Sequence, residues 1–405
     1  MKRWPMKPLG DVCEFVRGIT FKPTDLVEFD SPDSLACFRT KNVQASLETE
    51  DLIHIPRSFV KSDRQIIREG DTLISTANSN NLVGKCCYTS RLGYPATLGG
   101  FIAAIRAKPT QIQPRFLYYW LSSPFTQERF RGLARQTTNI SNLPLTDVAK
   151  ELAPVPPLLD QERIVKLLDE ADELRKLRAK ADRRTTEFIP AIFHEMFSIP
   201  ANSWQNSTLG KLVHDFHYGT SNKSTGEGKP TLRIPNVVQQ AVNLDDLKFV
   251  PVSDADFERL RLIDGDLLFV RTNGNADYVG RCAVFDTKTI QAAGYDTDEF
   301  IYASYLIRAR LQMEKVSPIF VQNFLTSFEG LSALRARSKT SAGQFNINTE
   351  GLSSIPIPVP PLPLQKEFVQ RVTEIRALET SQAASRRRLE ALFQSLLHRA
   401  FNGEL

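Results

Sequence analysis

The sequence contains few cysteines and lacks long uninterrupted hydrophobic runs. Its cysteines are Cys13, Cys37, Cys86, Cys87 and Cys282, with no Cys-x-x-Cys pair, so neither a disulfide framework nor a thiolate zinc site is indicated. No stretch approaches the roughly 18 apolar residues that span a bilayer. The amino terminus has basic residues but no apolar core of a signal peptide. We therefore expect reduced thiols, no membrane segment and a cytoplasmic protein.

The motifs of several enzyme classes are also missing from the sequence. An adenine amino-methyltransferase is expected to carry an Asn- or Asp-Pro-Pro-aromatic tetrapeptide, and an ATPase a Gly-x-x-x-x-Gly-Lys-Ser/Thr loop; neither pattern occurs. The carboxylates near predicted strands are scattered, and Asp71 and Asp266 fall in predicted turns. His214 and His217 would need two further ligands to hold a metal ion. We expect no catalytic residue, no metal site and no bound cofactor.

The length and composition are those of a folded protein with several domains. The 405 residues allow two or three domains of about 150 residues each. Hydrophobic residues make up 41% and charged residues 24%, which is ordinary for a globular protein. The net charge of +5 permits a polyanionic partner without requiring one.

One long repeat organises the chain. Val155-Pro156-Pro157-Leu158, followed by Gln161, recurs as Val359-Pro360-Pro361-Leu362, followed by Gln365, an offset of 359 − 155 = 204 residues. The segments that follow run without a gap to Phe197 and Phe401, which have the same offset. Each copy of the proline motif therefore introduces an equivalent segment.

Both of these segments have helical periodicity, because their apolar residues recur every three or four positions. The spacing is typical of a narrow coiled-coil seam, for which two ordinary surface helices are the alternative. We predict antiparallel helices with the following seam: Leu167, Ala171 and Leu174 against Val372, Ile375 and Leu378. The helix ends are more apolar and should pack against something larger than one helix. Pro190 should kink or restart the first helix.

The regions ahead of the two helices match more loosely. Gly70-Asp71 and Gly265-Asp266 each precede a run of β-forming residues, which predicts a turn entering a buried strand. Later strands are predicted over 101–106 and 300–308, and helices over 114–121 and 317–328. Each half is therefore predicted to be a mixed α and β domain followed by a long helix.

Polar and basic loops differ between the two halves and are candidates for DNA contact. Asn and Arg can make bidentate hydrogen bonds to adenine and guanine edges, whereas isolated Lys and Arg suit phosphate contacts. Turn formation and an ordinary solvated surface are the alternative readings of these loops. The candidate DNA-binding residues are Arg39, Lys41, Asn42, Asn78, Asn80, Lys85, Arg135, Lys223, Arg233, Asn236, Arg271, Asn273, Asn275, Arg281, Arg337 and Lys339.

These motifs together resemble the DNA specificity subunit of type I restriction-modification systems. The resemblance rests on the doubled Pro-Pro-Leu-x-x-Gln motif, on the Trp and Leu-Gly that open both halves, and on the closing residues 401–405. It covers essentially the whole chain. The first helix departs from the pattern after Phe197, where Ser198-Ile199-Pro200 replace the tail motif.

The resemblance implies an α+β fold class with two similar mixed α/β target recognition domains, separated by two long antiparallel coiled-coil helices in a pseudo-twofold internal repeat. The implied domains are 1–154 and 200–357, and the implied helical spacers are 155–199 and 358–405. Each domain would read one half of a bipartite, asymmetric site on double-stranded DNA.

The resemblance also implies partner proteins. Two copies of a DNA adenine methyltransferase subunit and an ATP-dependent restriction and translocase subunit would dock on this chain, which would itself be non-catalytic. S-adenosylmethionine, ATP and Mg are expected on those partners. Two alternatives stay open: a self-contained DNA-modifying enzyme with unusual motifs, and a coiled-coil scaffold that joins proteins without reading DNA.

Overall fold

The structure is a computed structural model that describes residues 4–137, 140–197, 204–238, 241–341 and 343–405. It divides into two compact units. Unit 1 comprises Met1–Ala179 with Ala384–Leu405, and unit 2 comprises Lys180–Ala383. Each unit thus contains a globular domain together with segments of the long helices. The departure predicted after Phe197, at residues 198–200, lies outside the described residues. The domain boundaries 1–154 and 200–357 remain a prediction of which segments act as independent domains.

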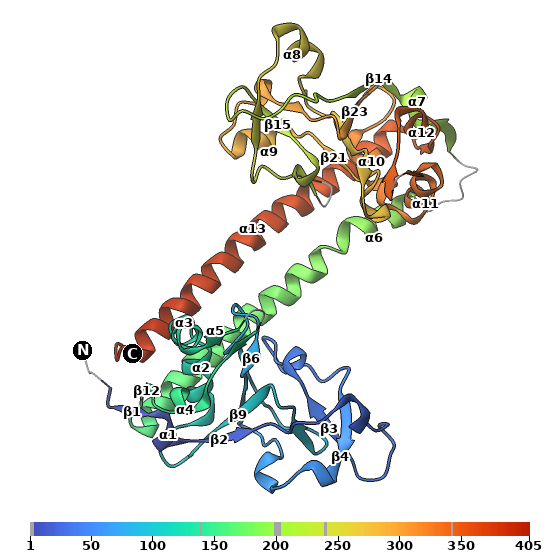
Figure 1. Cartoon of the computed structure of the whole chain (residues 1–405). Coiled ribbons are helices and arrows are strands. Elements are labelled where there is room, and N and C mark those ends of the chain that lie inside the picture. Colours follow the sequence, from blue (N-terminus) through green and yellow to red (C-terminus); the bar gives the residue numbers. More distant parts are fainter. Residues whose placement is uncertain (1–3, 138–139, 198–203, 239–240, 342) are drawn as a thin grey trace. The chain divides into compact units, whose positions relative to one another are not determined.

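The described residues of unit 1 form twelve strands and four short α-helices, together with segments of the long helices. The strands are β1 (Met6–Pro8), β2 (Cys13–Arg17), β3 (Ser34–Phe38), β4 (Ile53–Pro56), β5 (Thr72–Ser75), β6 (Ala77–Asn78), β7 (Cys86–Tyr88), β8 (Ala96–Leu98), β9 (Ile102–Ala107), β10 (Arg135–Gln136), β11 (Ser141–Asn142) and β12 (Leu152–Pro154). The short helices are α1 (Leu9–Val12), α2 (Pro114–Ser122), α3 (Pro124–Leu133) and α4 (Leu145–Val148). In Figure 1, α2, α3 and α4 lie next to a long helix, whereas β3 and β4 lie on the side of unit 1 farther from it.

Unit 2 repeats this plan with more elements. Its strands are β13 (Gln205–Thr208), β14 (Val213–Tyr218), β15 (Lys229–Leu232), β16 (Val237–Val238), β17 (Ala241–Val242), β18 (Lys248–Val250), β19 (Leu267–Val270), β20 (Thr272–Asn273), β21 (Cys282–Val284), β22 (Ile301–Tyr302), β23 (Leu306–Leu311), β24 (Lys339–Ser341), β25 (Gln344–Asn346) and β26 (Pro356–Val359). Its helices are α6 (Phe188–Phe197), α7 (Leu209–Leu212), α8 (Asp254–Leu260), α9 (Thr287–Ala292), α10 (Pro318–Thr326), α11 (Phe328–Arg337) and α12 (Thr349–Ser353).

Four sheets of unit 1 recur in unit 2 with the same strand order. The four-stranded sheet β2-β9-β5-β7 corresponds to β14-β23-β19-β21, and the three-stranded sheet β4-β3-β8 corresponds to β18-β15-β22. The small sheets β10-β11-β6 and β1-β12 correspond to β24-β25-β20 and β13-β26. The internal repeat predicted from motifs is therefore a repeat of whole sheets.

Two predicted element boundaries are wrong. The strand predicted over 300–308 is two strands, β22 and β23, because a turn closed by the Leu306 N–H and the Ala303 carbonyl (2.9 Å) separates them. The helix predicted through Phe328 ends at Thr326, since Ser327 caps the next helix by accepting the Gly330 N–H at 3.2 Å. Hydrophobic periodicity continues across both breaks, and it therefore cannot locate them.

The two long helices are α5 (Leu158–Thr185) and α13 (Leu362–Phe401). The first helix ends at Thr185 and restarts as α6 at Phe188, two residues before Pro190, as predicted. In unit 2, Thr185 accepts a hydrogen bond from Gln382 (2.9 Å), whereas Phe193 and Phe197 contact Phe368. From Thr185 to Phe197 the residue numbers rise, while those of the contacted residues on α13 fall from 382 to 368. The two helical segments therefore run antiparallel in this unit.

The predicted seam has the wrong register. In unit 1 the buried residues Ile164, Leu168 and Ala171 share a core with Phe393, Leu396, Leu397 and Ala400. Leu167 and Leu174 are 37% and 50% exposed, and Leu378 is 44% exposed. The predicted pairing joined positions near the start of each helix, but an antiparallel pair joins the start of one helix to the end of the other. The apolar helix ends pack against the globular domains, as Phe193 and Phe197 do against Phe320.

The glutamine of the doubled proline motif ties each long helix to its domain. Gln161 is fully buried; its Oε1 accepts the Gln113 N–H (2.7 Å) and its Nε2 donates to the Pro156 carbonyl (2.7 Å) and the Gln111 carbonyl (3.1 Å). Gln365 makes the same set of contacts, accepting the Ser317 N–H at 2.8 Å and donating to the Pro360 carbonyl at 2.7 Å. The motif therefore joins the segment before α2 or α10 to the start of a long helix.

Replacing Gln161 by alanine is expected to lower the free energy of unfolding of unit 1 by about 2–4 kcal/mol, because one buried and two partly buried backbone groups lose their partner. Urea unfolding followed by tryptophan fluorescence measures this change, since Trp4 and Trp120 both lie in unit 1. Lys166→Ala, at an exposed position of α5 in the same unit, is the matched control and should change stability by less than about 0.5 kcal/mol. Equal stability of Gln161→Ala and the wild type would contradict the tethering role.

All five cysteines are buried free thiols. Burial raises the pKa of Cys13, Cys37, Cys87 and Cys282 to about 12 and that of Cys86 still further. A thiol with so high a pKa is protonated at neutral pH and is a poor nucleophile. These side chains therefore act in packing.

Candidate nucleic-acid interface

In unit 1, a small sheet brings together two loops that are distant in sequence. Strand β11 pairs with β6 on one side and β10 on the other, so Asn78 lies opposite Ser141 and Arg135 lies opposite Asn142. The Asn78 amide donates to Ser75 Oγ at 3.2 Å, and its Oδ1 accepts the Ser79 N–H at 2.9 Å. The structure therefore joins two predicted DNA-binding residues, Asn78 and Arg135, through a strand between them.

Unit 2 repeats this sheet with other side chains. Strand β25 pairs with β20 and β24, so that Asn273 lies opposite Phe345 and Lys339 lies opposite Asn346. The Thr272 hydroxyl donates to Gln344 Oε1 at 3.2 Å and links the two strands further. The predicted residues Asn273 and Lys339 are thus placed on one small sheet.

The cationic side chains next to this second sheet stack on tyrosines. The Arg271 guanidinium is exposed and lies 4.8 Å from the centroid of the Tyr218 ring. The Arg281 guanidinium lies 3.7 Å from the Tyr278 ring and donates to the Asp277 carbonyl at 3.1 Å. Stacking on a ring orients an arginine without neutralising its charge. Both arginines therefore keep a positive charge available to a polyanion.

Two of the predicted residues have structural roles instead. Asn42 is 1% exposed and Asn236 is fully buried. Asn42 Oδ1 accepts the Arg39 N–H at 2.9 Å, and Asn236 Oδ1 accepts the Arg233 N–H at the same distance. Because their amides are used inside the domain, these asparagines hold a turn and are unavailable for base contact. Asn42 and Asn236 are therefore not among the residues that are proposed below to contact DNA.

The basic residues of those turns interact with a nearby aspartate. Lys41 forms an ion pair with Asp51, and Arg39 donates to the Asp51 carbonyl at 3.4 Å. Arg233 donates to the Asp246 carboxylate at 2.9 Å. Hydrogen bonds from Lys248 and Arg233 lower the pKa of Asp246 below its usual value. A phosphate would have to compete with these carboxylates for the same cations.

The remaining candidates fall into two groups. The exposed residues are Asn80, Lys223, Asn275 and Lys339. The others donate hydrogen bonds within the protein: Lys85 to Gln44, Arg135 to Asp147 at 3.4 Å, and Arg337 to Ser354 Oγ at 2.9 Å. Arg135 still has 76% of its side chain exposed, so its guanidinium remains accessible.

The central strand of each small sheet was missed by sequence reasoning. Asn142 in β11 and Asn346 in β25 differ by 346 − 142 = 204 residues, the offset of the helical repeat. The next residue in each case, Leu143 or Ile347, donates its N–H to the Thr76 or Arg271 carbonyl (2.8 and 2.9 Å). The recurrence of asparagine at this offset is the signal that could have identified these strands.

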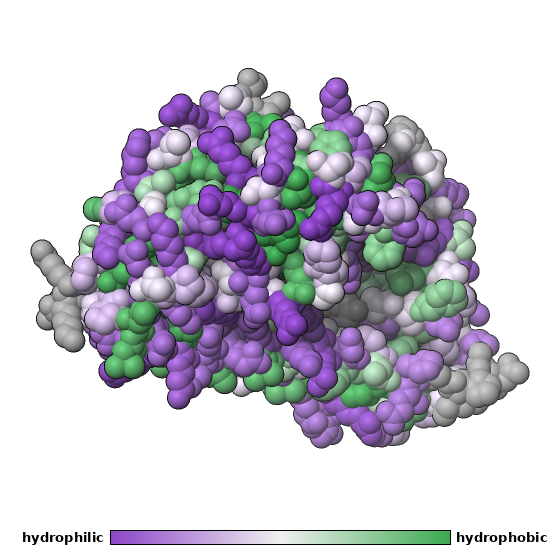
Figure 2. Space-filling model, turned by 90° about the horizontal axis from the view of Figure 1, so that it is seen from below, coloured by the Kyte–Doolittle hydropathy of each residue, from purple (hydrophilic) through white to green (hydrophobic). Residues whose placement is uncertain are grey.

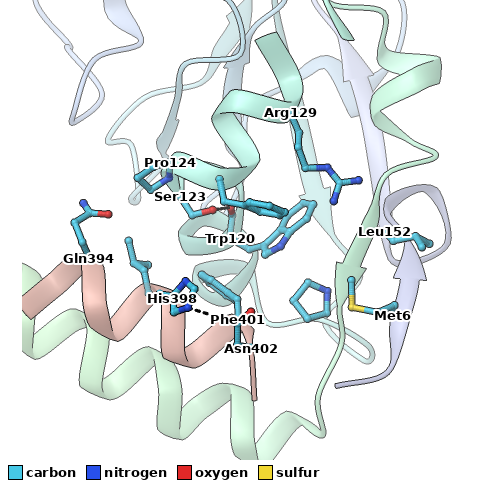
Figure 3. Close-up of a pocket in the computed structure, with 13 residues that line it drawn as sticks. Met6, Trp120, Ser123, Pro124, Arg129, Leu152, Gln394, His398, Phe401 and Asn402 are labelled. Carbon is cyan, nitrogen blue, oxygen red and sulfur yellow. Dashed lines mark hydrogen bonds between the residues drawn. The ribbon is translucent and has the colours of Figure 1, made fainter. Parts of the chain in front are cut away.

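An apolar pocket of about 490 Å³ lies in unit 1 beside the end of α13. Figure 3 shows Trp120 and Phe401 within it, Met6 and Leu152 at one side, and Gln394 and His398 on α13. Its polar side chains hydrogen-bond locally: Asn402 lies 2.8 Å from His398 Nε2, and the Ser123 hydroxyl donates to the Trp120 carbonyl at 2.8 Å. The pocket therefore offers mainly apolar surface.

His217 Nε2 lies 3.0 Å from Asp215 Oδ2. Within the part of the chain that the structure describes, no three His, Cys, Asp or Glu side chains gather as a metal site requires. Among the same residues, no helix has the length and hydrophobicity that a membrane crossing requires.

Comparison with known proteins shows which proteins this chain resembles. Residues 1–182 match the family model described as the type I restriction modification DNA specificity domain. The chain is 28% identical to the type I restriction enzyme EcoKI specificity subunit of Escherichia coli strain K12, over 99% of this chain and 89% of the relative. The predicted resemblance is confirmed: over almost its whole length the chain is similar to type I specificity subunits. The StySPI specificity subunit of Salmonella potsdam is 26% identical over the same shares of both chains.

Two solved structures have the same fold. One, from work on complex assembly and conformational transition of the type I R-M system, has a TM-score of 0.63 at 19% identity and covers 100% of this chain and 99% of its own. The type I S subunit from M. genitalium has a TM-score of 0.57 at 16% identity, with 98% and 96% covered. The predicted fold class, two mixed domains with long helices, is confirmed for this chain.

Proposed function

We propose that this chain is a type I specificity subunit and that it reads a bipartite, asymmetric sequence on double-stranded DNA, with one half-site for each unit. The observation that supports this proposal is the small sheet that recurs in both units with different side chains. A common framework with different loops suits two readers that recognise different sequences.

The chemistry of the differing positions fits direct readout. Unit 1 has Thr76 where unit 2 has Arg271. The Thr76 N–H donates to the Phe101 carbonyl, and the Arg271 N–H donates to the equivalent Tyr305 carbonyl. Arginine favours guanine in the major groove, whereas asparagine favours adenine. Arg271 directly follows β19, and Thr76 directly follows β5 at the equivalent position, so the two units are predicted to prefer different bases.

The chain also docks partner subunits in this proposal, and it carries no catalytic residue of its own. The long helices expose apolar side chains that the protein itself does not cover, namely Leu167, Leu174, Leu177, Leu378 and Leu392. Figure 2 shows hydrophobic residues between hydrophilic ones on the face drawn there. These side chains and the pocket beside Trp120 provide surface for two methyltransferase subunits, which a restriction and translocase subunit would join. S-adenosylmethionine, ATP and Mg would be bound by those partners.

A domain exchange tests the proposal. Residues 1–154 are replaced by the corresponding domain of a relative that recognises another sequence, and the chimera is co-expressed with its methyltransferase subunit. Mapping of adenine methylation across a genome should show one half of the recognised sequence changed and the other half retained. A change in both halves, or in neither, would contradict two independent readers; methylation without this chain would contradict its role as the specificity subunit.

Two substitutions in unit 2 should have different effects. Arg271→Ala is expected to relax one base position of one half-site, at a loss of about 1–3 kcal/mol for a bidentate contact. Lys339→Ala should weaken binding to all sequences alike and reduce the slope of log affinity against log salt by about 1, because a phosphate contact is lost. Binding of the complex to duplexes with single base changes, at several salt concentrations, separates the two effects. Identical profiles for the two variants would contradict this assignment.

A further inference from the structure

One pair of exposed aromatic side chains occupies equivalent places in the two units. Phe101 is 65% exposed and Tyr305 is 59% exposed, and their positions differ by 305 − 101 = 204 residues. Each lies in the tight turn that precedes the central strand β9 or β23. Among the exposed large aromatic residues of the described ranges, these two alone recur as an aromatic pair at equivalent positions.

Both turns are hydrogen-bonded to a loop that is proposed to read DNA. This reading loop comprises residues 75–81 in unit 1 and residues 270–277 in unit 2. The Phe101 carbonyl accepts the N–H groups of Thr76 (2.9 Å) and Ala77 (3.3 Å), and the Tyr305 carbonyl accepts the Arg271 N–H (2.9 Å). Asn78 follows directly after Ala77, and Asn273 is two residues after Arg271. Each exposed ring therefore belongs to a residue that is hydrogen-bonded to the start of the reading loop.

Close backbone packing fixes these turns. A Cβ at Gly18 would lie 2.1 Å from the Gly99 carbonyl oxygen, and a Cβ at Gly219 would lie 2.2 Å from the Tyr302 carbonyl oxygen. The turns are closed by matching hydrogen bonds, from Ile102 to Gly99 (3.0 Å) and from Leu306 to Ala303 (2.9 Å). A ring on so constrained a backbone loses little conformational entropy when it meets a ligand.

A single exposed aromatic residue needs no functional explanation, because folded proteins expose much apolar surface. An aromatic residue that recurs in both units does need an explanation, because neighbouring residues differ between the units: Gly100 corresponds to Ser304, and Thr76 to Arg271. Apolar side chains, phenylalanine among them, contact the C5-methyl group of thymine in the major groove. An aromatic ring next to polar reading residues suits that contact.

We propose that Phe101 and Tyr305 are specificity-determining residues, and that each ring packs against base edges of the half-site read by its own unit. This inference rests on the proposed function. The two rings contribute apolar contacts and release no counterions, unlike the lysines and arginines nearby.

The test uses the complex of the full chain with its methyltransferase subunits and a duplex library randomised over both half-sites. Bound duplexes are selected and sequenced for the wild type, Phe101→Ala and Tyr305→Ala. We expect Phe101→Ala to reduce discrimination roughly 5- to 100-fold at one or two positions of one half-site. Tyr305→Ala should do the same in the other half-site only. The slope of log affinity against log salt should stay unchanged in both variants.

Phe29→Ala and Phe328→Ala are the matched controls, because these side chains are 79% and 85% exposed in units 1 and 2 and are not part of the turns. They should leave both half-site profiles unchanged. Unchanged profiles for Phe101→Ala and Tyr305→Ala, or a uniform loss across all sequences, would overturn the inference while leaving the proposed function intact. If the wild-type complex selects no bipartite sequence, the proposed function itself fails, and the inference with it.

Discussion

Insertion of four residues into both α5 and α13 is expected to lengthen the preferred spacer between the half-sites by one or two base pairs. Four residues add about 6 Å at about 1.5 Å per residue, and they are close to one helical turn, so the buried faces stay nearly aligned. A length of 6 Å corresponds to nearly two base pairs at about 3.4 Å each. Both half-site sequences should stay the same, because the reading loops are untouched.

The structure indicates where the insertions belong. Arg175 forms an ion pair with Glu390 in unit 1, and Thr185 bonds Gln382 in unit 2. Insertions after Ala179 and after Ala384 fall between these two contacts on both helices, and the contacts themselves are retained. The measurement is methylation by the reconstituted complex on substrates whose spacer varies by one base pair at a time.

An insertion in α5 alone is the control. It changes the length of one helix and leaves the other unaltered, so the antiparallel pairing cannot be kept at both ends. This variant should lose affinity for every spacer. An unchanged spacer optimum in the double insertion would mean that the helices hold partner subunits and that something else measures the DNA.

Replacing Arg106 by alanine is expected to lower the free energy of unfolding of unit 1 by about 3–5 kcal/mol. The Asp71 carboxylate is 1% exposed and receives hydrogen bonds from Arg106 Nε and Nη2, both at 2.7 Å, and from the Arg68 N–H at 2.8 Å. The hydrogen bonds that Arg106 donates to Asp71 raise the pKa of Arg106 above its usual value. Loss of the guanidinium would leave a buried, unpaired carboxylate. Urea unfolding followed by the fluorescence of Trp4 and Trp120 measures the loss.

A second substitution separates the charge from the packing. Asp71→Asn keeps an acceptor for the Arg68 N–H but removes the charge, so Asp71→Asn combined with Arg106→Leu should recover much of the stability lost in Arg106→Ala. Arg310→Ala, in the equivalent pair with Asp266, should cost less, because Arg310 is 28% exposed and Arg106 only 11%. If the double variant is no more stable than Arg106→Ala, the burial of an unpaired charge is not the cause of the loss.

Local sequence patterns determined the repeat and the identity of its elements. The Pro-Pro-Leu-x-x-Gln motif, the Gly-Asp turns and the helical spacing of apolar residues depend on neighbours within one element, and they located the long helices and the entry to β5 and β19. The restart of the first helix near Pro190 was predicted for the same reason, since proline removes a backbone donor from its own helix.

Contacts between distant residues were decided only by the tertiary structure. The predicted register of the long helices was wrong, because the spacing of Leu167 and Leu174 indicates an apolar face of one helix but not the residues that pack against it. The burial of Asn42 and Asn236 was hidden, because a loop asparagine that holds a turn looks the same in sequence as one that meets a base. The pairing of β11 with β6 and of β25 with β20 joined residues that are 141 − 78 = 63 and 345 − 273 = 72 positions apart. Arg106 met Asp71 across β9 and β5. Such pairings depend on the summed packing of whole sheets, which no local pattern encodes.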